Sequence, residues 1–168
     1  KIMEKLLTRI AWFVGLVLVQ VLFLNHICWF GVATPFLYIY LLLIIDRDID
    51  RNVLMLLAFA MGLSVDVFCN TFGVNAAACV LLAFLRPWLI RICAPRDEFE
   101  NFEPGIQTLG IWSFFRYALL ATLIHHTALF FLESFSVRHI GFVFLRIVFS
   151  ALLTLMMVMA VDFVRNRR

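Results

Sequence analysis

Six ionisable residues lie inside strongly apolar stretches of the sequence, where a charge needs a partner or a purpose. They are Asp66, Arg86, Arg116, His125, His126 and Arg146. We predict a buried pair between Asp66 and Arg146, because a helical rise of about 1.5 Å per residue places both at a similar depth. Two other interpretations of Asp66 stay open, namely a proton or ion site and a contact with a partner helix.

The side chains that could do catalysis are not arranged for it. His125 and His126 are adjacent, so on a helix they point about 100° apart and cannot share one metal ion. Cys28, Cys69, Cys79 and Cys93 form no CxxC pair and have no histidine at the spacing of metal ligands. GxSxG, HExxH, a phosphate-binding loop and paired membrane aspartates are all missing from the sequence. We therefore predict a protein that is not an enzyme and that uses neither a metal nor another cofactor.

The composition identifies the elements that must position these residues. The chain has 168 residues, of which 64% are hydrophobic and 15% charged, whereas a soluble domain has about 45–50% and about 25%. This balance excludes a soluble enzyme, a nucleic-acid-binding protein and a secreted disulfide scaffold. We predict one all-α integral membrane domain over residues 1–168. Its six transmembrane helices are expected at about residues 8–24, 34–45, 53–70, 74–92, 111–132 and 140–164.

The distribution of lysine and arginine predicts the orientation of these helices. With both termini inside, the inner loops and tails hold ten of these residues, whereas the outer loops hold only Arg138. An even number of spans is needed to place both termini on the same side. The outer connections are all short, so any action outside the membrane would have to pass through a partner.

Two inner features suggest contacts at the cytoplasmic side. Arg86 and Arg116 fall in the inner half of their helices, where they can reach carbonyls, headgroups or the acidic inner loop by snorkelling. Pro87 is expected to bend its helix or free carbonyls near Ala83, and Arg86 could satisfy these. The acidic segment at residues 96–103 is either a solvated loop or a docking strip, with Phe99 and Phe102 as its anchors.

Residues 50–87 carry a resemblance to a known family. The stretch includes Gly62-Leu63-Ser64-Val65-Asp66, a short turn with Gly73, and Leu85-Arg86-Pro87 in the following helix. This pattern resembles the MreD family of rod shape-determining proteins, most closely its versions in Bacteroidetes. Outside these residues the chain resembles the family only in its length, span number and orientation.

The resemblance implies a fold and a set of partners. Members of the family are six-span bacterial inner-membrane proteins, similar in fold to the substrate-binding components of vitamin (ECF-type) transporters. They bind MreC, which connects to the wall synthase RodA and its transpeptidase partner, and MreB filaments lie on the inner side. The positions carried over are Gly62, Asp66, Gly73 and Arg86, and we expect them, with Arg116 and Arg146, to be structural or partner-interface residues.

We therefore expect a non-catalytic scaffold of the cell-elongation complex, embedded in the lipid bilayer, that binds MreC and helps regulate peptidoglycan synthesis and cell shape. A homo-oligomer is compatible with this prediction, and a nucleic-acid partner is not expected. The main alternative is the substrate-binding membrane component of a vitamin transporter, which would need an outward pocket rich in polar side chains. An intramembrane enzyme that acts on lipid or peptide would need a polar cavity around Asp66.

Overall fold

The computed structural model describes residues 2–27, 29, 31–94, 102–134 and 140–165 of the chain. These residues form helices, with a single isolated bridge between Trp29 and Ala33. The α-helices are α1 (Ile2–Leu22), α2 (Tyr40–Ile44), α3 (Arg51–Cys69), α4 (Val74–Cys93), α5 (Ile106–Leu109), α6 (Ile111–Ser134) and α7 (Ile140–Arg165). Two short 3-10 helices, η1 (Leu24–His26) and η2 (Leu37–Ile39), complete the described secondary structure.

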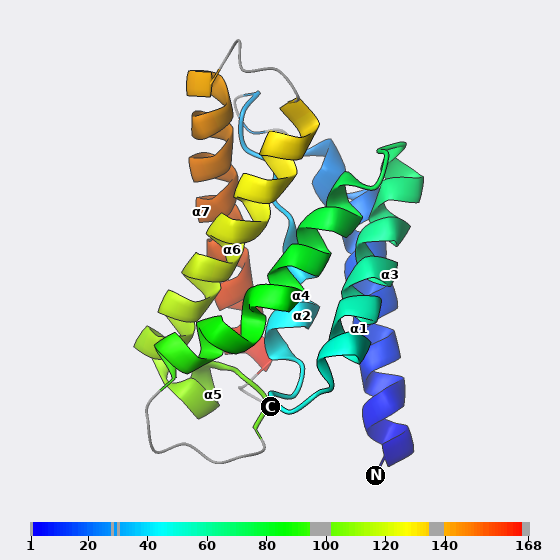
Figure 1. Cartoon of the computed structure of the whole chain (residues 1–168), viewed down its shortest axis with the longest axis vertical. Helices are drawn as coiled ribbons and strands as arrows, with labels where there is room; N and C mark the ends of the chain where they lie inside the picture. Colours follow the sequence, from blue (N-terminus) through cyan, green and yellow to red (C-terminus); the bar gives the residue numbers. More distant parts are fainter. Residues whose placement is uncertain (1, 28, 30, 95–101, 135–139, 166–168) are drawn as a thin grey trace.

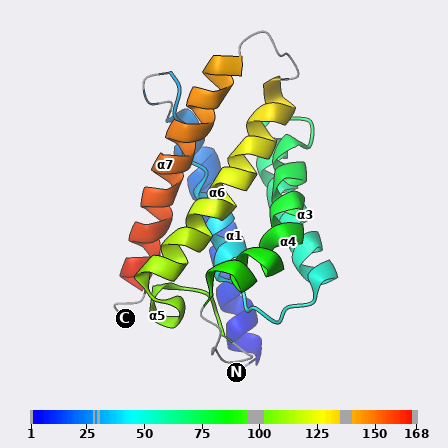
Figure 2. The same ribbon diagram turned by 60° about the vertical axis from the view of Figure 1, so that its left-hand side comes forward.

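Five of these helices, α1, α3, α4, α6 and α7, are long and apolar enough to cross a bilayer. They run along the long axis of the molecule, with α6 beside both α4 and α7, and α1 against α3 (Figures 1 and 2). The prediction of an all-α, multi-pass membrane protein is therefore confirmed for the described residues. The predicted spans at residues 8–24, 53–70, 74–92, 111–132 and 140–164 correspond to these helices, although α1 begins six residues earlier than predicted.

The prediction of a transmembrane helix at residues 34–45 is wrong. This part of the chain, which we call the central segment, begins extended and becomes helical only at η2 and the five-residue α2. It runs through the middle of the bundle in cyan (Figure 1), and residues 36–45 are all buried. The extended start follows from Pro35, which has no N–H and biases Thr34 away from the helical region. An extended chain also covers more distance per residue than a helix, so this short segment reaches far along the bundle axis.

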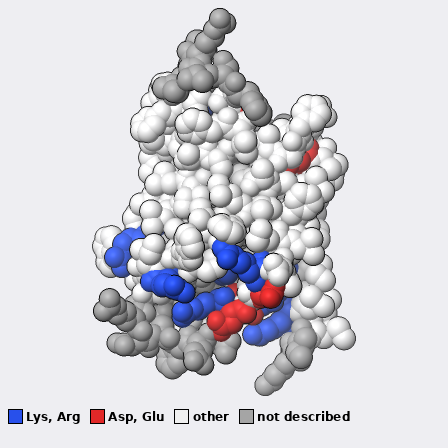
Figure 3. Space-filling view, in the orientation of Figure 1, with Lys and Arg blue, Asp and Glu red and all other residues white. Residues whose placement is uncertain are grey.

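The two ends of the bundle differ in charge. The start of α1 and the end of α7 lie at the same end (Figure 1), where Lys, Arg, Asp and Glu side chains gather on the surface (Figure 3). We call this the charged end. Hollows at this end are lined by the charged residues Glu4, Lys5, Arg9, Asp46, Asp48, Glu103 and Arg165. The middle of the bundle shows an almost uncharged surface in the same view, as lipid contact requires.

Candidate functional site

Asp66 holds the beginning of α4. Its Oδ1 accepts hydrogen bonds from the Asn75 amide at 3.1 Å and the Asn75 side chain at 2.9 Å, and its Oδ2 accepts from the Ala76 amide at 2.9 Å. The Thr71 hydroxyl also donates to this carboxylate. Helix α4 begins after Gly73, which has no side chain to cap it. Asp66, although it belongs to the preceding helix, thus supplies the cap and a negative charge at the positive end of α4.

Gly62 makes this capping contact possible. A Cβ atom at Gly62 would lie 2.6 Å from the Ala76 nitrogen and 2.6 Å from the Asn75 carbonyl oxygen, distances that real Cβ atoms do not adopt. Helices α3 and α4 therefore pack backbone against backbone at this point. The close approach brings the Asp66 carboxylate, one helical turn further along, within reach of the α4 amides.

Gly73 completes the connection between the two helices. Its φ of 77° and the φ of 55° at Asn70 are both left-handed, and they turn the chain sharply between α3 and α4. Three of the four positions that carry the resemblance, Gly62, Asp66 and Gly73, thus belong to one structural unit. We call this unit the α3–α4 hairpin.

The predicted pair between Asp66 and Arg146 is wrong. Arg146 forms an ion pair with Glu133, at 3.2 Å between Nη2 and Oε2, and lies over the Phe130 ring at 4.4 Å. The Asp66 carboxylate instead accepts hydrogen bonds from backbone amides and a hydroxyl. A similar depth in two helices does not make two side chains neighbours, because their directions around the helix axes also have to match.

Arg86 holds the end of α2. This side chain is 1% exposed, and its guanidinium donates to the carbonyls of Leu43 at 3.3 Å, Ile45, and Asp46 at 3.4 Å. The Arg86 Nε also donates to the Tyr117 hydroxyl at 3.1 Å. The predicted reach to carbonyls is confirmed, but these carbonyls belong to the end of the central segment rather than to the neighbourhood of Ala83. A cation here stabilises the negative end of the short helix.

Gln20 on α1 binds the extended part of the central segment from one side. Its Oε1 accepts from the Leu37 amide at 2.9 Å, and its Nε2 donates to the Pro35 carbonyl at 2.9 Å. The same Nε2 donates to the Asn25 side chain at 2.8 Å. Gln20 is fully buried, so one amide side chain replaces two backbone hydrogen bonds that a helix would have made.

Two hydroxyls of α7 bind the same stretch from the other side. The Ser150 hydroxyl accepts from the Thr34 amide at 3.0 Å, and the Thr154 hydroxyl accepts from the Phe36 amide at 3.0 Å. Thr154 also contacts His126 Nε2 at 3.1 Å, while His126 Nδ1 lies 2.7 Å from the Thr122 carbonyl. Since a carbonyl only accepts, Nδ1 carries a proton. In the neutral tautomer with this proton, Nε2 accepts a hydrogen bond from the Thr154 hydroxyl. Non-helical backbone at membrane depth is thus satisfied by side chains.

Tyr38 connects the central segment to the α3–α4 hairpin. Its hydroxyl donates to Asn75 Oδ1 at 2.9 Å and lies 2.9 Å from His125 Nε2. Asn75 uses its Nδ2 to donate to Asp66, so its Oδ1 is the acceptor for the only proton of Tyr38. His125 therefore donates from Nε2 to the Tyr38 hydroxyl. Its buried Nδ1 has no hydrogen-bond partner in the described part of the chain.

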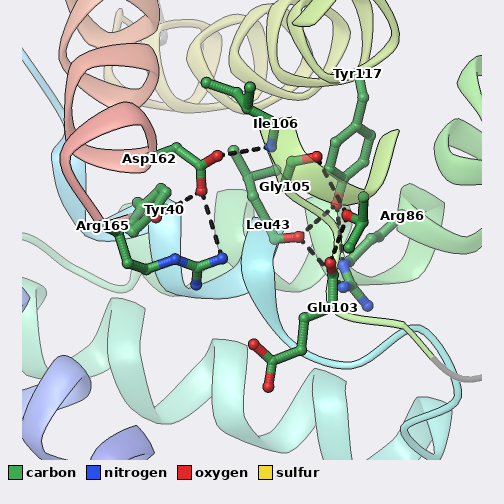
Figure 4. A network of polar contacts seen from close by, with 10 residues as sticks. Tyr40, Leu43, Arg86, Glu103, Gly105, Ile106, Tyr117, Asp162 and Arg165 are labelled. Atoms are coloured by element: carbon green, nitrogen blue, oxygen red, sulfur yellow. Dashed lines mark hydrogen bonds and ion pairs between the residues drawn. The ribbon is translucent and has the colours of Figure 1, made fainter. Parts of the chain in front are cut away.

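Asp162 gathers the polar contacts near the end of α7 (Figure 4). The fully buried carboxylate accepts from the Tyr40 hydroxyl at 2.8 Å and from the Ile106 amide at 2.7 Å, and it pairs with Arg165 at 3.5 Å. A Cβ atom at Gly105 would lie 3.4 Å from Asp162 Oδ2 and 3.3 Å from Arg165 Nη2, so Gly105 lies directly beside this ion pair. Asp162 thus ties α7 to the central segment and to the start of α5.

The remaining predicted site residues lie apart from these networks. Arg116 is exposed on α6. Phe102 is partly buried against the core, with the Arg47 guanidinium 5.5 Å from its ring centre and the Arg47 amide donating to its carbonyl at 3.0 Å. Phe102 therefore anchors its loop to the protein itself. Phe99 lies outside the described residues.

Sequence reasoning missed several residues that position the central segment. Gln20, Ser150, Thr154 and Asp162 are all fully buried. A signal was present, because polar residues in apolar helices face protein rather than lipid, and Ser150 and Thr154 are four residues apart on one face. Tyr38 and Tyr40 gave no such signal, because they were indistinguishable from the apolar residues around them.

The networks around Asp66 and Arg86 connect side chains to the backbone of other elements. Both buried charges in the middle of the chain, Asp66 and Arg86, are engaged by groups of the protein's own backbone. Within the residues that the structure describes, no three His, Cys, Asp or Glu side chains are placed to hold a metal ion. Asp66 and Arg86 therefore fix the geometry of the bundle.

Two apolar grooves lie on the membrane-facing surface. One, of about 650 Å³, runs between α3 and α4 and is lined by Met55, Phe59, Leu63, Gly73, Ala76, Ala77, Val80, Leu81 and Phe84. The other runs between α1 and α7 and is lined in its apolar part by Thr8, Ala11, Trp12, Gly15, Leu16, Val19, Leu37 and Val161. We call them the α3/α4 groove and the α1/α7 groove.

Fold and site together define an all-α, multi-pass membrane protein with a discontinuous segment in its centre. Comparison with known proteins finds no family model, no curated protein and no solved structure that matches the chain.

Proposed function

We propose that this protein is a non-catalytic membrane scaffold of a bacterial cell-elongation complex, as its resemblance to the MreD family implies. In this function it binds the membrane helix of an MreC-like partner and so helps regulate peptidoglycan synthesis and cell shape. The observation that carries the proposal is the α3–α4 hairpin. Gly62, Asp66 and Gly73, which carry the resemblance in sequence, act together in one structural unit.

The orientation fits an inner-membrane scaffold. The charged end holds the positive residues that favour the cytoplasmic side, including Lys5, Arg9 and Arg165. RodA and its transpeptidase partner would then be reached through MreC outside, whereas MreB would lie at the charged end.

We place the partner helix in the α3/α4 groove. Its floor includes Gly73, Ala76 and Ala77, and small residues let a second helix approach closely. Its walls include Phe59, Leu63 and Leu81, which are 46%, 41% and 41% exposed and can pack around an incoming side chain. The hairpin contact at Gly62 and Asp66 keeps the groove in shape by fixing α3 against α4.

The test is co-purification of the tagged protein from native membranes in mild detergent, followed by mass spectrometry. The proposal expects a single-span protein with a periplasmic domain, together with wall synthases. Ala77→Trp would fill the groove and abolish recovery of the partner. Leu56→Trp would preserve this recovery, because Leu56 is a 69% exposed side chain of α3 that does not line the groove. Equal recovery with both variants would contradict the placement of the partner, and absence of the partner from the native protein would contradict the function.

One observation favours a second candidate, the substrate-binding component of a vitamin transporter. Transporters often bind their substrates at discontinuous membrane segments near the middle of the bilayer, and the central segment is one. Its amides at Thr34, Phe36 and Leu37 are, however, all bonded to side chains of the protein. Recovery of paired ATPases and a transporter membrane subunit in the same experiment would favour this candidate over the scaffold.

A further inference from the structure

The α1/α7 groove continues into the charged end. Trp12 lines three hollows on this side of the bundle. The first is the apolar hollow of the groove, of about 530 Å³. The second, of about 430 Å³, lies beside Val164, and the third, of about 530 Å³, lies at the charged end. Arg165 lines both the second and the third. The three hollows therefore lie next to one another around Trp12, and their walls change from apolar to charged towards the charged end.

The groove is open because of the residues on α1. A Cβ atom built on Gly15 meets no other atom within 4 Å, and Ala11 lies one turn away on the same wall. The apolar wall extends from Thr8 to Val19, which at about 1.5 Å per residue is a length of about 16 Å. That length matches one leaflet, since the hydrocarbon core of a bilayer is about 30 Å thick. A crossing helix would need twice this length, whereas a lipid tail needs one leaflet.

The charged part of the groove carries both signs. Lys5, Arg9 and Arg165 line the same hollow as the carboxylates of Glu4 and Glu103. Two of the cations are fixed by ion pairs, Arg9 with Asp46 and Arg165 with Asp162. The carboxylate of Glu103 points away from the Asp162 cluster (Figure 4), and no ion pair within the described residues engages it.

A headgroup that fits this hollow needs a negative and a positive group. A phosphate can accept from Lys5 and Arg165, and a primary ammonium can donate to Glu103. A lipid with phosphate and no cation would leave the Glu103 carboxylate facing a like charge. A choline headgroup carries the positive charge but has no N–H to donate.

We propose that the α1/α7 groove binds a phospholipid of the leaflet at the charged end, with a phosphate and a primary ammonium in its headgroup. Lys5 and Arg165 bind the phosphate, and Glu103 binds the ammonium. One acyl chain lies over Trp12, Ala11 and Gly15 against the central segment. The lipid then covers Leu37 of the central segment, which lines this groove.

The headgroup preference is tested by native mass spectrometry of the delipidated full chain. The probes are palmitoyl-oleoyl phosphatidylethanolamine, phosphatidylglycerol and phosphatidylcholine, added back separately. We expect the ethanolamine lipid to be retained about fivefold over the other two, the size of one exposed charge pair. Glu103→Gln should remove this preference, whereas Glu133→Gln, a carboxylate at the opposite end of the bundle, should keep it. Equal retention of all three lipids by the native protein, or no effect of Glu103→Gln, would overturn the proposal.

The groove itself is tested by filling it. Gly15→Leu should lower the retention of all three lipids, because its side chain occupies the space of the acyl chain. Gly141→Leu is the matched control, since a Cβ there also meets no atom within 4 Å but lies outside the groove. Unchanged retention in Gly15→Leu would place the lipid elsewhere and overturn the proposal. A photo-reactive residue at Ala11 in native membranes should yield a lipid adduct, and a protein adduct instead would show that a partner helix occupies the groove.

Discussion

The α3–α4 hairpin and the central segment solve the same problem in different ways. In both regions, backbone groups without helical partners are buried inside the bundle. In the hairpin, the free amides are hydrogen-bonded locally, because Asp66 accepts from amides nine and ten residues further along the chain. The central segment is satisfied at long range, because Thr34 and Phe36 bind hydroxyls 116 and 118 residues away. The hairpin can form from its own sequence, whereas the central segment needs the assembled bundle.

We expect the largest loss of stability when Arg86, the charged anchor of the central segment, is replaced. Arg86→Leu leaves the buried carbonyl of Ile45 without a donor and the carbonyl of Leu43 with only the Tyr117 hydroxyl, and we expect a loss of about 4 kcal/mol of stability. The measurement is reversible unfolding in mixed micelles. Arg116→Leu, on the exposed face of α6, is the control and should cost less than about 0.5 kcal/mol. Equal effects of the two variants would mean that Arg86 does not hold the segment.

A smaller loss is expected when the charged anchor of the hairpin is removed. Asp66→Ala takes away the acceptor of the Asn75 and Ala76 amides and should cost about 3 kcal/mol. Asp66→Asn keeps one acceptor and should lose about half of this. The loss is measured by the same unfolding experiment. The control is Asp48→Asn, at an exposed position of the charged end. If Asp66→Asn and Asp66→Ala lose equally, the charge rather than the geometry of the cap is what matters.

The close approach inside the hairpin is tested by one methyl group. Gly62→Ala should cost about 2 kcal/mol, because its Cβ meets the backbone of Ala76 and forces the helices apart. Gly15→Ala is the matched control, since its Cβ enters open space and alanine favours the helix by about 0.5–1 kcal/mol. Cross-linking between α3 and α4 gives an independent readout. If Gly62→Ala left the free energy of unfolding unchanged, the two helices would not touch at this point.

The smallest expected effect separates the two regions most sharply. Thr154→Val leaves the Phe36 amide without its acceptor and should cost about 1–2 kcal/mol. Hydrogen exchange should increase at Phe36 and its neighbours and stay unchanged at Asn75 and Ala76. Thr127→Val, an exposed threonine of α6, serves as the control. Faster exchange in the hairpin as well would mean that the two regions are not independent.

The sequence predicted the parts of the fold that depend on neighbouring residues. Apolar runs gave the long helices, because burial in lipid is a property of each stretch by itself. The pattern Gly62, Asp66 and Gly73 was recognised, but the partner of Asp66 was misassigned. Depth along the helices predicts only which ionisable side chains could meet, whereas the true partners of Asp66 include backbone amides, which no residue type reveals.

The central segment was misread because its opening residues suit two structures. Thr34-Pro35 is a good helix start, but proline equally begins an extended stretch when other side chains supply hydrogen bonds. The deciding residues, Gln20, Ser150 and Thr154, lie on two other helices. Its short length was the only local indication that a continuous helix would not cross the membrane.

The long-range contacts of the central segment also constrain how the protein is made. A growing chain leaves the ribosome from its N-terminus, so Thr34 and Phe36 are synthesised long before α7 supplies Ser150 and Thr154. Until then their amides need water or another temporary partner. Insertion into the membrane therefore has to end with a rearrangement in which the last helix closes over a segment made early. A chain interrupted before α7 would expose unpaired backbone in the bilayer, which makes it a ready substrate for membrane proteases.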